Sequence, residues 1–181
     1  VKILNCSLNT SHRYIRTYYA RMYEAKFLMG AVAGAMSENG QLAYIADYPI
    51  FGTIANINAF ALGAKMINPR ARVYLEWSTL KDLDIRLAME NVQKKGVTVV
   101  SGKDMVIPED ASRYFGLYHL TEEGPHNLAM PLWHWGKFYE QLIRTIMDGT
   151  WKYDDNKDET KAINYWWGLS AEVIDVIYSQ K

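Results

Sequence analysis

The chain has little of several features that would settle its class at once. Its 181 residues include one cysteine, Cys6, and twenty Lys and Arg balance twenty Asp and Glu. A single cysteine makes no internal disulfide, so cysteine usage does not indicate the cellular compartment, and we expect Cys6 to be a small buried residue. The balanced charge provides no overall field that would attract nucleic acid or an anionic membrane surface.

Long apolar runs are also missing. The most apolar stretch, residues 27–36, is about half of the ~20 residues that a membrane-spanning helix needs. With 49% hydrophobic residues the chain can still bury a substantial core, which excludes a mainly disordered protein. Because the chain starts at Val1 inside a predicted strand, without Met, we expect a processed or truncated chain from which a signal peptide could have been lost.

Strand and helix patterns alternate over the first part of the chain. Residues 1–4 predict a short strand, and residues 17–36 predict one long helix whose small-residue face, Gly30 and Gly34, should lie close against a sheet. Further strands are predicted at 41–46, 72–77 and 97–100, with helices at 54–66 and 82–95. This alternation predicts an α/β fold with a doubly wound, mostly parallel sheet.

The last third of the chain mixes shorter elements. The patterns predict a fourth strand at 114–118, an extended piece at 128–132, a helix at 136–147, an extended piece at 165–169 and a helix at 171–178. This order indicates that the tail crosses back to a neighbouring lobe.

Aromatic residues stand at several predicted strand ends. Ligands of such sheets gather at the carboxyl ends of the strands, where loops lead into helix N-termini. Asp47-Tyr48-Pro49 is one such loop, and Pro49 fixes its exit angle. Tyr48, Trp77, Trp133 and Trp135 could stack on a flat heterocycle, which is worth ~1–3 kcal/mol. Core packing is the more frequent reason for such aromatics, and Trp77 is the exception that we favour as a stacking residue.

Patterns for catalysis, phosphate binding and metal binding are weak. The segment SGKDM at residues 101–105 lacks the earlier glycine and the Ser or Thr of a P-loop, so we interpret it as a polar binding loop. The four histidines show no i, i+4 pair and no cysteine at zinc spacing, and no nucleophile signature occurs. We therefore expect no enzymatic activity, no metal and no cofactor.

Four segments resemble those of a known family. They are YARMYEAKFLMGAVAGAM, LAYIADYPIFGTIANINAFALGAKMINP, LWHWGKFYEQLIRTIMDGTW and YWWGL. They look like segments, in the same order, of the basic membrane protein family of ABC transporter substrate-binding lipoproteins, which includes the purine nucleoside receptors. The resemblance covers most of the chain. It implies the C-terminal lobe of a type I periplasmic-binding-protein fold, which is flavodoxin-like or Rossmann-like and whose two lobes close around a ligand.

The same resemblance implies a binding site. An aromatic residue after the strand that corresponds to residues 72–77 stacks on the base in nucleoside-binding relatives, and Trp77 is the matching residue. The loop after the next strand contributes backbone contacts, which maps onto residues 101–104. The predicted ligand-binding residues are Trp77, Tyr48, Asp47, Gly102, Lys103, Asp104 and Trp133.

Three departures from the family bear on the ligand. Residues 103–112 are too short for the family's helix, GLYHL stands where relatives carry the Asp-rich DSD that holds the ribose, and Trp133 stands where nucleoside receptors place a lysine. Ribose hydroxyls left unpaired in a closed cleft would each cost ~1–3 kcal/mol. The predicted ligand class is a small flat heterocycle such as a purine base or nucleoside. Within it the departures count against a nucleoside and leave a bare base or another flat heterocycle open.

These observations lead to one functional prediction and one alternative. We predict one lobe of the substrate-binding component of an ABC importer, with residues 1–16 as an inter-lobe segment, 17–181 as the C-terminal lobe, and 126–181 crossing back to the first lobe. The expected partners are a small heterocyclic ligand, the membrane subunits of the transporter and the N-terminal lobe of the same protein, without nucleic acid. The expected location is extracytoplasmic, with a lipoprotein anchor. The alternative is a ligand-sensing regulatory domain of a transcriptional or signalling protein.

Overall fold

The chain forms two compact units. The computed structural model describes residues 2–7, 15–78, 85–104, 113–151 and 164–180. The smaller unit comprises Val1–Arg21 and Trp133–Asp175, and the larger unit comprises Met22–Leu132 and Val176–Lys181. Each unit is described by itself. The lobe boundaries expected from the sequence remain predictions.

The larger unit is built on a six-stranded sheet in the order β4-β3-β5-β6-β7-β9. Its strands are β3 (Gln41–Ala46), β4 (Arg72–Trp77), β5 (Val99–Ser101), β6 (Leu117–Thr121), β7 (Gly124–Trp133) and β9 (Ile174–Tyr178). The central strand β3 pairs in parallel with β4 and with β5, whereas β6 runs antiparallel to both β5 and β7. The predicted α/β fold with a parallel-rich sheet is confirmed.

Helices cover both faces of the parallel part of this sheet. Successive side chains of β3 point to opposite faces. On one face, the ring of Tyr44 contacts Phe60 of α2 (Phe51–Ile67). On the other face, Ala43 and Ile45 form a core cluster with Val92 of α3 (Ile85–Gln93). This is the doubly wound arrangement that the sequence predicts.

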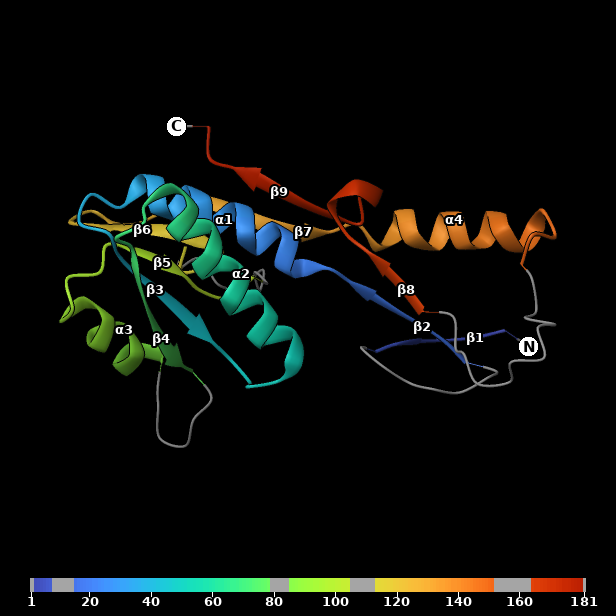
Figure 1. The fold of residues 1–181 in the computed structure, drawn as a ribbon, viewed down its shortest axis with the longest axis horizontal. Coiled ribbons are helices and arrows are strands. Elements are labelled where there is room, and N and C mark those ends of the chain that lie inside the picture. Colours follow the sequence, from blue (N-terminus) through green and yellow to red (C-terminus); the bar gives the residue numbers. More distant parts are fainter. Residues whose placement is uncertain (1, 8–14, 79–84, 105–112, 152–163, 181) are drawn as a thin grey trace. The chain divides into compact units, whose positions relative to one another are not determined.

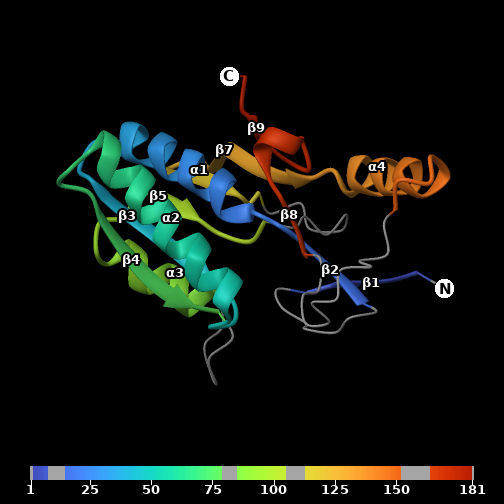
Figure 2. The same ribbon diagram turned by 45° about the vertical axis from the view of Figure 1, so that its right-hand side comes forward.

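The helices α1 (Met22–Met36) and α2 lie side by side in both views (Figures 1 and 2). A Cβ added at Gly30 would lie 2.1 Å from the carbonyl oxygen of Phe60, and one added at Gly63 would lie 2.0 Å from that of Phe27. The prediction that the small residues of α1 face the sheet is therefore wrong. They face α2 instead, because α2 carries its own small residue, Gly63, at the crossing.

The smaller unit contains a parallel three-stranded sheet in the order β1-β2-β8. Its strands are β1 (Ile3–Cys6), β2 (Ile15–Ala20) and β8 (Asn164–Trp167). The long helix predicted from residue 17 is wrong before Met22, because the β-branched and aromatic residues of β2 favour a strand between two partners. The prediction of a buried Cys6 is also wrong, because Cys6 ends the edge strand β1 and is exposed.

An aromatic cluster holds the helix α4 (Trp135–Met147) in the smaller unit. Phe138 is buried and stacks on Tyr18 at 4.7 Å between ring centroids, and it also meets Trp167 edge-on at 5.1 Å. Trp135 meets the rings of Tyr18 and Phe138 edge-on. It thus packs within the aromatic cluster, as the sequence favours. The helix predicted at 136–147 is confirmed.

The helix predicted at 171–178 is wrong. A short 3-10 turn, η1 (Leu169–Ala171), ends at Glu172 in the left-handed conformation with φ 55°, and the strand β9 follows. Buried and exposed residues alternate at the start of β9, where Ile174 and Val176 are buried and Asp175 is exposed. This period of two indicates a strand.

The remaining bounds differ by a few residues from the predicted ones. α2 begins at Phe51 rather than at 54, β5 spans Val99–Ser101 rather than 97–100, and β6 spans Leu117–Thr121 rather than 114–118. Part of the helix predicted at 82–95 and most of segment 103–112 lie outside the described residues. Within the described part of the chain, no helix combines the length and apolar character that a membrane crossing requires.

Candidate functional site

The carboxyl ends of β3, β4 and β5 meet at one edge of the sheet. Ala46 pairs with Trp77, and Tyr44 pairs with Ser101. The Ser78 amide donates to the Ala46 carbonyl at 2.7 Å, which continues the pairing past the last residues of β3 and β4. We call this edge the carboxyl edge and define it as residues 46–48, 77–78 and 101–104. It brings together six of the seven predicted ligand-binding residues.

The loop between β3 and α2 forms one side of the carboxyl edge. The Asp47 carboxylate accepts the Tyr48 amide hydrogen at 2.8 Å, and the Ile50 amide donates to the Tyr48 carbonyl across Pro49 at 2.8 Å. No side chain caps α2, whose cap residue is Ile50. The first backbone N–H groups of a helix carry partial positive charge, so α2 begins with polar donors near an apolar loop.

Large apolar side chains of this loop are exposed. Tyr48 is 61% exposed and Phe51 is 66% exposed, and Ile50 lies between them with similar exposure. Trp77, at the end of the neighbouring strand, is half-buried. Contiguous exposed apolar side chains are typical of binding surfaces. Trp77 is therefore neither sealed in the core nor fully in solvent, as a stacking residue requires.

The loop after β5 forms the other side of the edge. Ser101 and Gly102 are buried, Lys103 is exposed and Asp104 is half-buried. The Gly102 amide donates to the Gly116 carbonyl at 2.8 Å, and the Gly116 amide donates to the Lys103 carbonyl at 2.5 Å. The sequence predicts that this loop offers backbone groups to a ligand, but the Gly102 N–H and the Lys103 carbonyl are already bonded within the protein.

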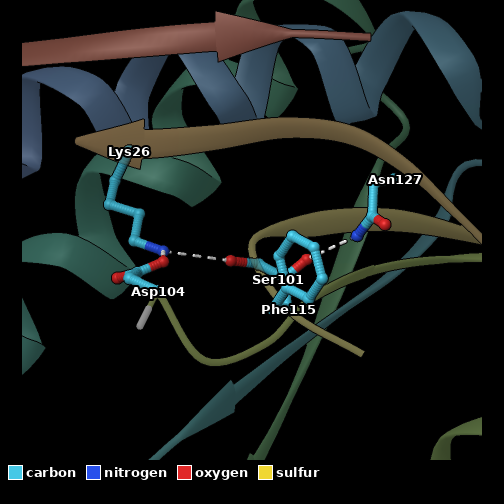
Figure 3. A network of polar contacts seen from close by, with 5 residues as sticks. All are labelled: Lys26, Ser101, Asp104, Phe115 and Asn127. Atoms are coloured by element: carbon cyan, nitrogen blue, oxygen red, sulfur yellow. Dashed lines mark hydrogen bonds and ion pairs between the residues drawn. The ribbon is translucent and has the colours of Figure 1, made fainter. Parts of the chain in front are cut away.

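Lys26 of α1 also reaches the carboxyl edge, and sequence reasoning missed it. Its side chain is fully buried, its ammonium forms an ion pair with Asp104, and Ser101 Oγ lies 3.4 Å away (Figure 3). The missed signal is spacing, because Met22, Lys26 and Gly30 follow one another at i, i+4 along the buried side of α1. A lysine on an otherwise apolar stripe needs an anionic partner inside the fold.

Two carboxylates of the carboxyl edge affect the pKa of Tyr44 in β3. Burial raises the pKa of the Tyr44 hydroxyl above its ordinary value, and the negative charges of Asp104 and Asp47 raise it further. The hydroxyl therefore stays protonated at neutral pH. The ammonium of Lys26 lies 5.2 Å from the centroid of the Tyr44 ring.

Trp133 is the one predicted ligand-binding residue outside the larger unit. It ends β7, is half-buried and belongs to the smaller unit. Its role at a ligand stays a prediction.

The described residues also bear on metal and ligand sites elsewhere in the chain. No group of three or more His, Cys, Asp or Glu side chains gathers at the carboxyl edge or elsewhere in the described ranges in a way that could hold a metal ion. Two surface hollows are formed by other residues. One of about 580 Å³ lies along α4, and one of about 470 Å³ is lined by polar residues near the amino ends of β3 and β4, including Gln41 and Arg72.

The family model of PnrA-like ABC transporter substrate-binding proteins, named Bmp, matches residues 9–107, which is more than half of the chain. The chain belongs to this family. The match runs from β2 to the loop after β5 and so includes the whole carboxyl edge. The Bmp family is one of solute-binding proteins, which agrees with the prediction made from the sequence segments.

Two curated relatives differ in the ligand that their names carry. A proposed ABC transporter glucose-binding protein of Haloferax volcanii is 29% identical over 147 residues, which is 76% of this chain and 38% of that protein. A purine-binding protein of Brucella abortus is 27% identical over 170 residues, which is 87% of this chain and 45% of that protein. The chain thus spans less than half the length of these relatives.

Solved structures share the fold. An ABC transporter solute-binding protein from Conexibacter woesei aligns over 98% of this chain and 61% of its own with a TM-score of 0.64 and 13% identity. A transcriptional activator of the comK gene from Bacillus halodurans aligns over 98% of this chain and 62% of its own, with the same TM-score and 16% identity. At such identities the likeness concerns the fold alone.

Proposed function

We propose that this Bmp-family chain is one lobe of the substrate-binding component of an ABC importer, and that its carboxyl edge binds a small flat heterocycle such as a purine base. The protein acts outside the cytoplasm, anchored as a lipoprotein, and delivers its ligand to the membrane subunits of the transporter. Its other lobe is the N-terminal part of the same protein. The observation that carries the proposal is the half-buried Trp77 at the end of β4, beside the exposed loop of Tyr48 and Phe51.

Each part of the edge has a role in this proposal. The Trp77 ring stacks on the ligand, and Tyr48 offers a second aromatic surface. The Asp47 carboxylate accepts a hydrogen bond from a ring N–H or an exocyclic amine. Closure of the two lobes covers the exposed apolar side chains of the β3–α2 loop, which favours the closed, liganded state because apolar area leaves water. Lys103 and Asp104 of the loop after β5 complete the predicted contacts at this edge.

A purine base is the ligand class that we favour over a sugar. Sugars also stack on aromatic rings, and one curated relative carries glucose in its name. A sugar, however, presents many hydroxyl groups, and each one left unpaired in a closed site costs ~1–3 kcal/mol. The described edge combines aromatic and aliphatic surface with the carboxylates of Asp47 and Asp104, and the latter is already paired with Lys26. Such a surface suits a ligand with a large flat face and few polar groups.

Calorimetry on the whole protein that carries this chain tests the proposal. Adenine, guanine, hypoxanthine, their nucleosides and glucose form the panel. We expect a purine base to bind, and Trp77→Ala to abolish that binding because the stacking surface is lost. Trp166→Ala is the matched control, since Trp166 is a partly exposed tryptophan of the smaller unit outside the predicted site, and it should bind as the wild type does. Binding of glucose alone, or of nothing in the panel, contradicts the proposal.

The regulatory alternative is tested by the sequence that precedes Val1. A signal peptide with a lipid-attachment cysteine is expected for the importer component. A DNA-binding helix-turn-helix there would instead establish the sensing role.

A further inference from the structure

Lys26 of α1 is a fully buried charged group that the proposed function does not yet use. Lys26 has 0% of its side chain exposed, although burying an ammonium group removes its hydration at a large cost. The other buried residues of α1 are Met22, Ala25, Met29, Gly30, Ala33 and Gly34, which are all apolar or small. A lysine in this company must be compensated by specific partners.

Among the described residues, the two polar partners of Lys26, Asp104 and Ser101, lie at the carboxyl edge. Its ammonium pairs with the carboxylate of Asp104, lies 3.4 Å from Ser101 Oγ, and approaches the ring of Tyr44 at 5.2 Å from the centroid. Ser101 is the last residue of β5, and Asp104 stands three residues further on in the loop. The ion pair thus ties this loop to α1, as Figure 3 shows.

A second set of hydrogen bonds ties the same loop to β6 and β7. The side-chain amide of Asn127 donates to the carbonyl of Arg113 at 2.8 Å. It also donates to the carbonyl of Phe115 at 3.0 Å (Figure 3). Phe115 forms a parallel bridge with Lys103. Backbone bonds between Gly116 and both Gly102 and Lys103 complete this side of the loop. The loop is therefore held by a neutral network from one side and by a charge pair from α1.

The backbone at Gly116 leaves this neutral network little freedom to adjust. Gly116 has a φ of 59°, and a Cβ there would lie 2.4 Å from the Ala129 carbonyl oxygen. The position of the segment that receives the Gly102 amide is thus fixed by contact with β7. The Lys26–Asp104 pair holds the described part of the loop at Asp104.

We propose that Lys26 is a positioning residue for the ligand site, which rests on the proposed function of the carboxyl edge. Through Asp104 it holds the backbone of residues 102–104 in the conformation that meets the ligand. The loop is then already ordered before the ligand binds, so binding does not cost the conformational entropy of the loop. Without the ammonium, the partly exposed Asp104 carboxylate turns to water and takes the loop with it.

Amide hydrogen exchange without ligand tests the positioning directly. In the whole protein, Lys26→Met is expected to increase exchange of the Gly102 amide at least about tenfold and to leave the Val99 amide, inside β5, unchanged. Lys95→Met is the matched control, because Lys95 also pairs with a carboxylate, Glu76, and lies 4.9 Å from a tyrosine ring centroid, but at an exposed position. It should leave Gly102 unchanged. Wild-type exchange at Gly102 in a folded Lys26→Met protein overturns the proposal.

A double variant keeps the test valid if Lys26→Met does not fold. Lys26→Met with Asp104→Leu removes both charges together, which buried ion pairs usually tolerate. We expect it to fold and to show the same faster exchange at Gly102. Unchanged exchange in the double variant overturns the proposal as surely as it would in the single one.

Affinity separates this proposal from the proposed function. If the wild type binds adenine, a folded Lys26→Met protein should bind it about tenfold more weakly, whereas a merely structural lysine would leave affinity intact. Equal affinity in the two proteins overturns the role of Lys26 and leaves the function standing. If the wild type binds no heterocycle, the proposed function fails, and the exchange experiment still decides whether Lys26 positions the loop.

Discussion

Two lysines of the larger unit each pair with a carboxylate and lie over a tyrosine ring, but in different surroundings. Lys26 pairs with Asp104 and lies over Tyr44, and Lys95 pairs with Glu76 and lies over Tyr74. The first lysine is fully buried, whereas the side chain of Lys95 is 41% exposed. The comparison teaches that contact chemistry does not set the energy of an ion pair. The access of the ammonium group to water does, since Asp104 and Glu76 are similarly exposed, at 17% and 15%. Solvent screens the pair with the exposed lysine, which we call the exposed pair, more than the pair with the buried one.

Removing the carboxylate that pairs with the buried lysine should have the largest effect. Asp104→Ala leaves the Lys26 ammonium without its ion-pair partner in a place that water does not reach. We expect the free energy of unfolding to fall by ~3–5 kcal/mol, as urea denaturation followed by circular dichroism would measure. Glu76→Ala is the matched change at the exposed pair. If Asp104→Ala and Glu76→Ala lowered the free energy of unfolding by similar amounts, the difference that we expect between the two ion pairs would be contradicted.

Removing the buried ammonium should cost less than removing its partner. Lys26→Met keeps most of the aliphatic stem, and the Asp104 carboxylate that remains is 17% exposed and can turn toward solvent. We expect a loss of ~1–3 kcal/mol in the same denaturation experiment. The order of the two losses is the informative result. A greater loss for Lys26→Met than for Asp104→Ala would mean that Asp104, and not Lys26, is the trapped charge.

The exposed pair should contribute little and depend on salt. Lys95→Met and Glu76→Gln are each expected to change the free energy of unfolding by ~0–1 kcal/mol at low ionic strength. Because the Debye length falls to ~3 Å at 1 M salt, the difference from wild type should vanish there. The Asp104→Ala difference should persist in 1 M salt. If Lys95→Met lowered the free energy of unfolding by the same amount at low and high salt, the two ion pairs would be equally shielded from solvent.

The tyrosine beside Lys26 gives the smallest effect at neutral pH and a growing one in alkali. Burial raises the folded-state pKa of Tyr44, so the folded protein keeps a proton that the unfolded chain loses near pH 10. Stability from this group is present below that pH and is lost as the pH rises further. Tyr44→Phe should therefore weaken the decline in urea midpoint between pH 8 and 10.5. An equally steep decline in the variant would place its origin elsewhere, for example at Tyr118.

The strands that frame the site could be predicted from the sequence because their signals are local. The segments Gln41–Ala46 and Arg72–Trp77 were both expected at their observed bounds. Each is a largely apolar run between turn residues, and Pro49 follows the first. The place of Trp77 at the end of β4 follows from the same signals, whereas its role at a ligand remains a prediction.

The parts that were missed depend on partners far away in the sequence. The residues of β2 fit a helical spacing as well as a strand, and the choice is made by β1 and β8, the latter some 150 residues later in the chain. The burial of Lys26 depends on Asp104, 78 positions further on. The crossing of α1 with α2 likewise requires Gly30 and Gly63 together. A short window of sequence contains only one half of each of these pairs.

The glycine crossing has a mechanical consequence for the two loops of the carboxyl edge. Lys26, one turn before Gly30, tethers the loop after β5, and α2 starts at the loop that contains Tyr48. Where a carbonyl oxygen of one helix fills the place of a missing side chain on the other, neither helix can slide without a steric collision. The two helices must then move as one rigid body. A displacement of the loop after β5 would therefore be transmitted to the β3–α2 loop on the other side of the site.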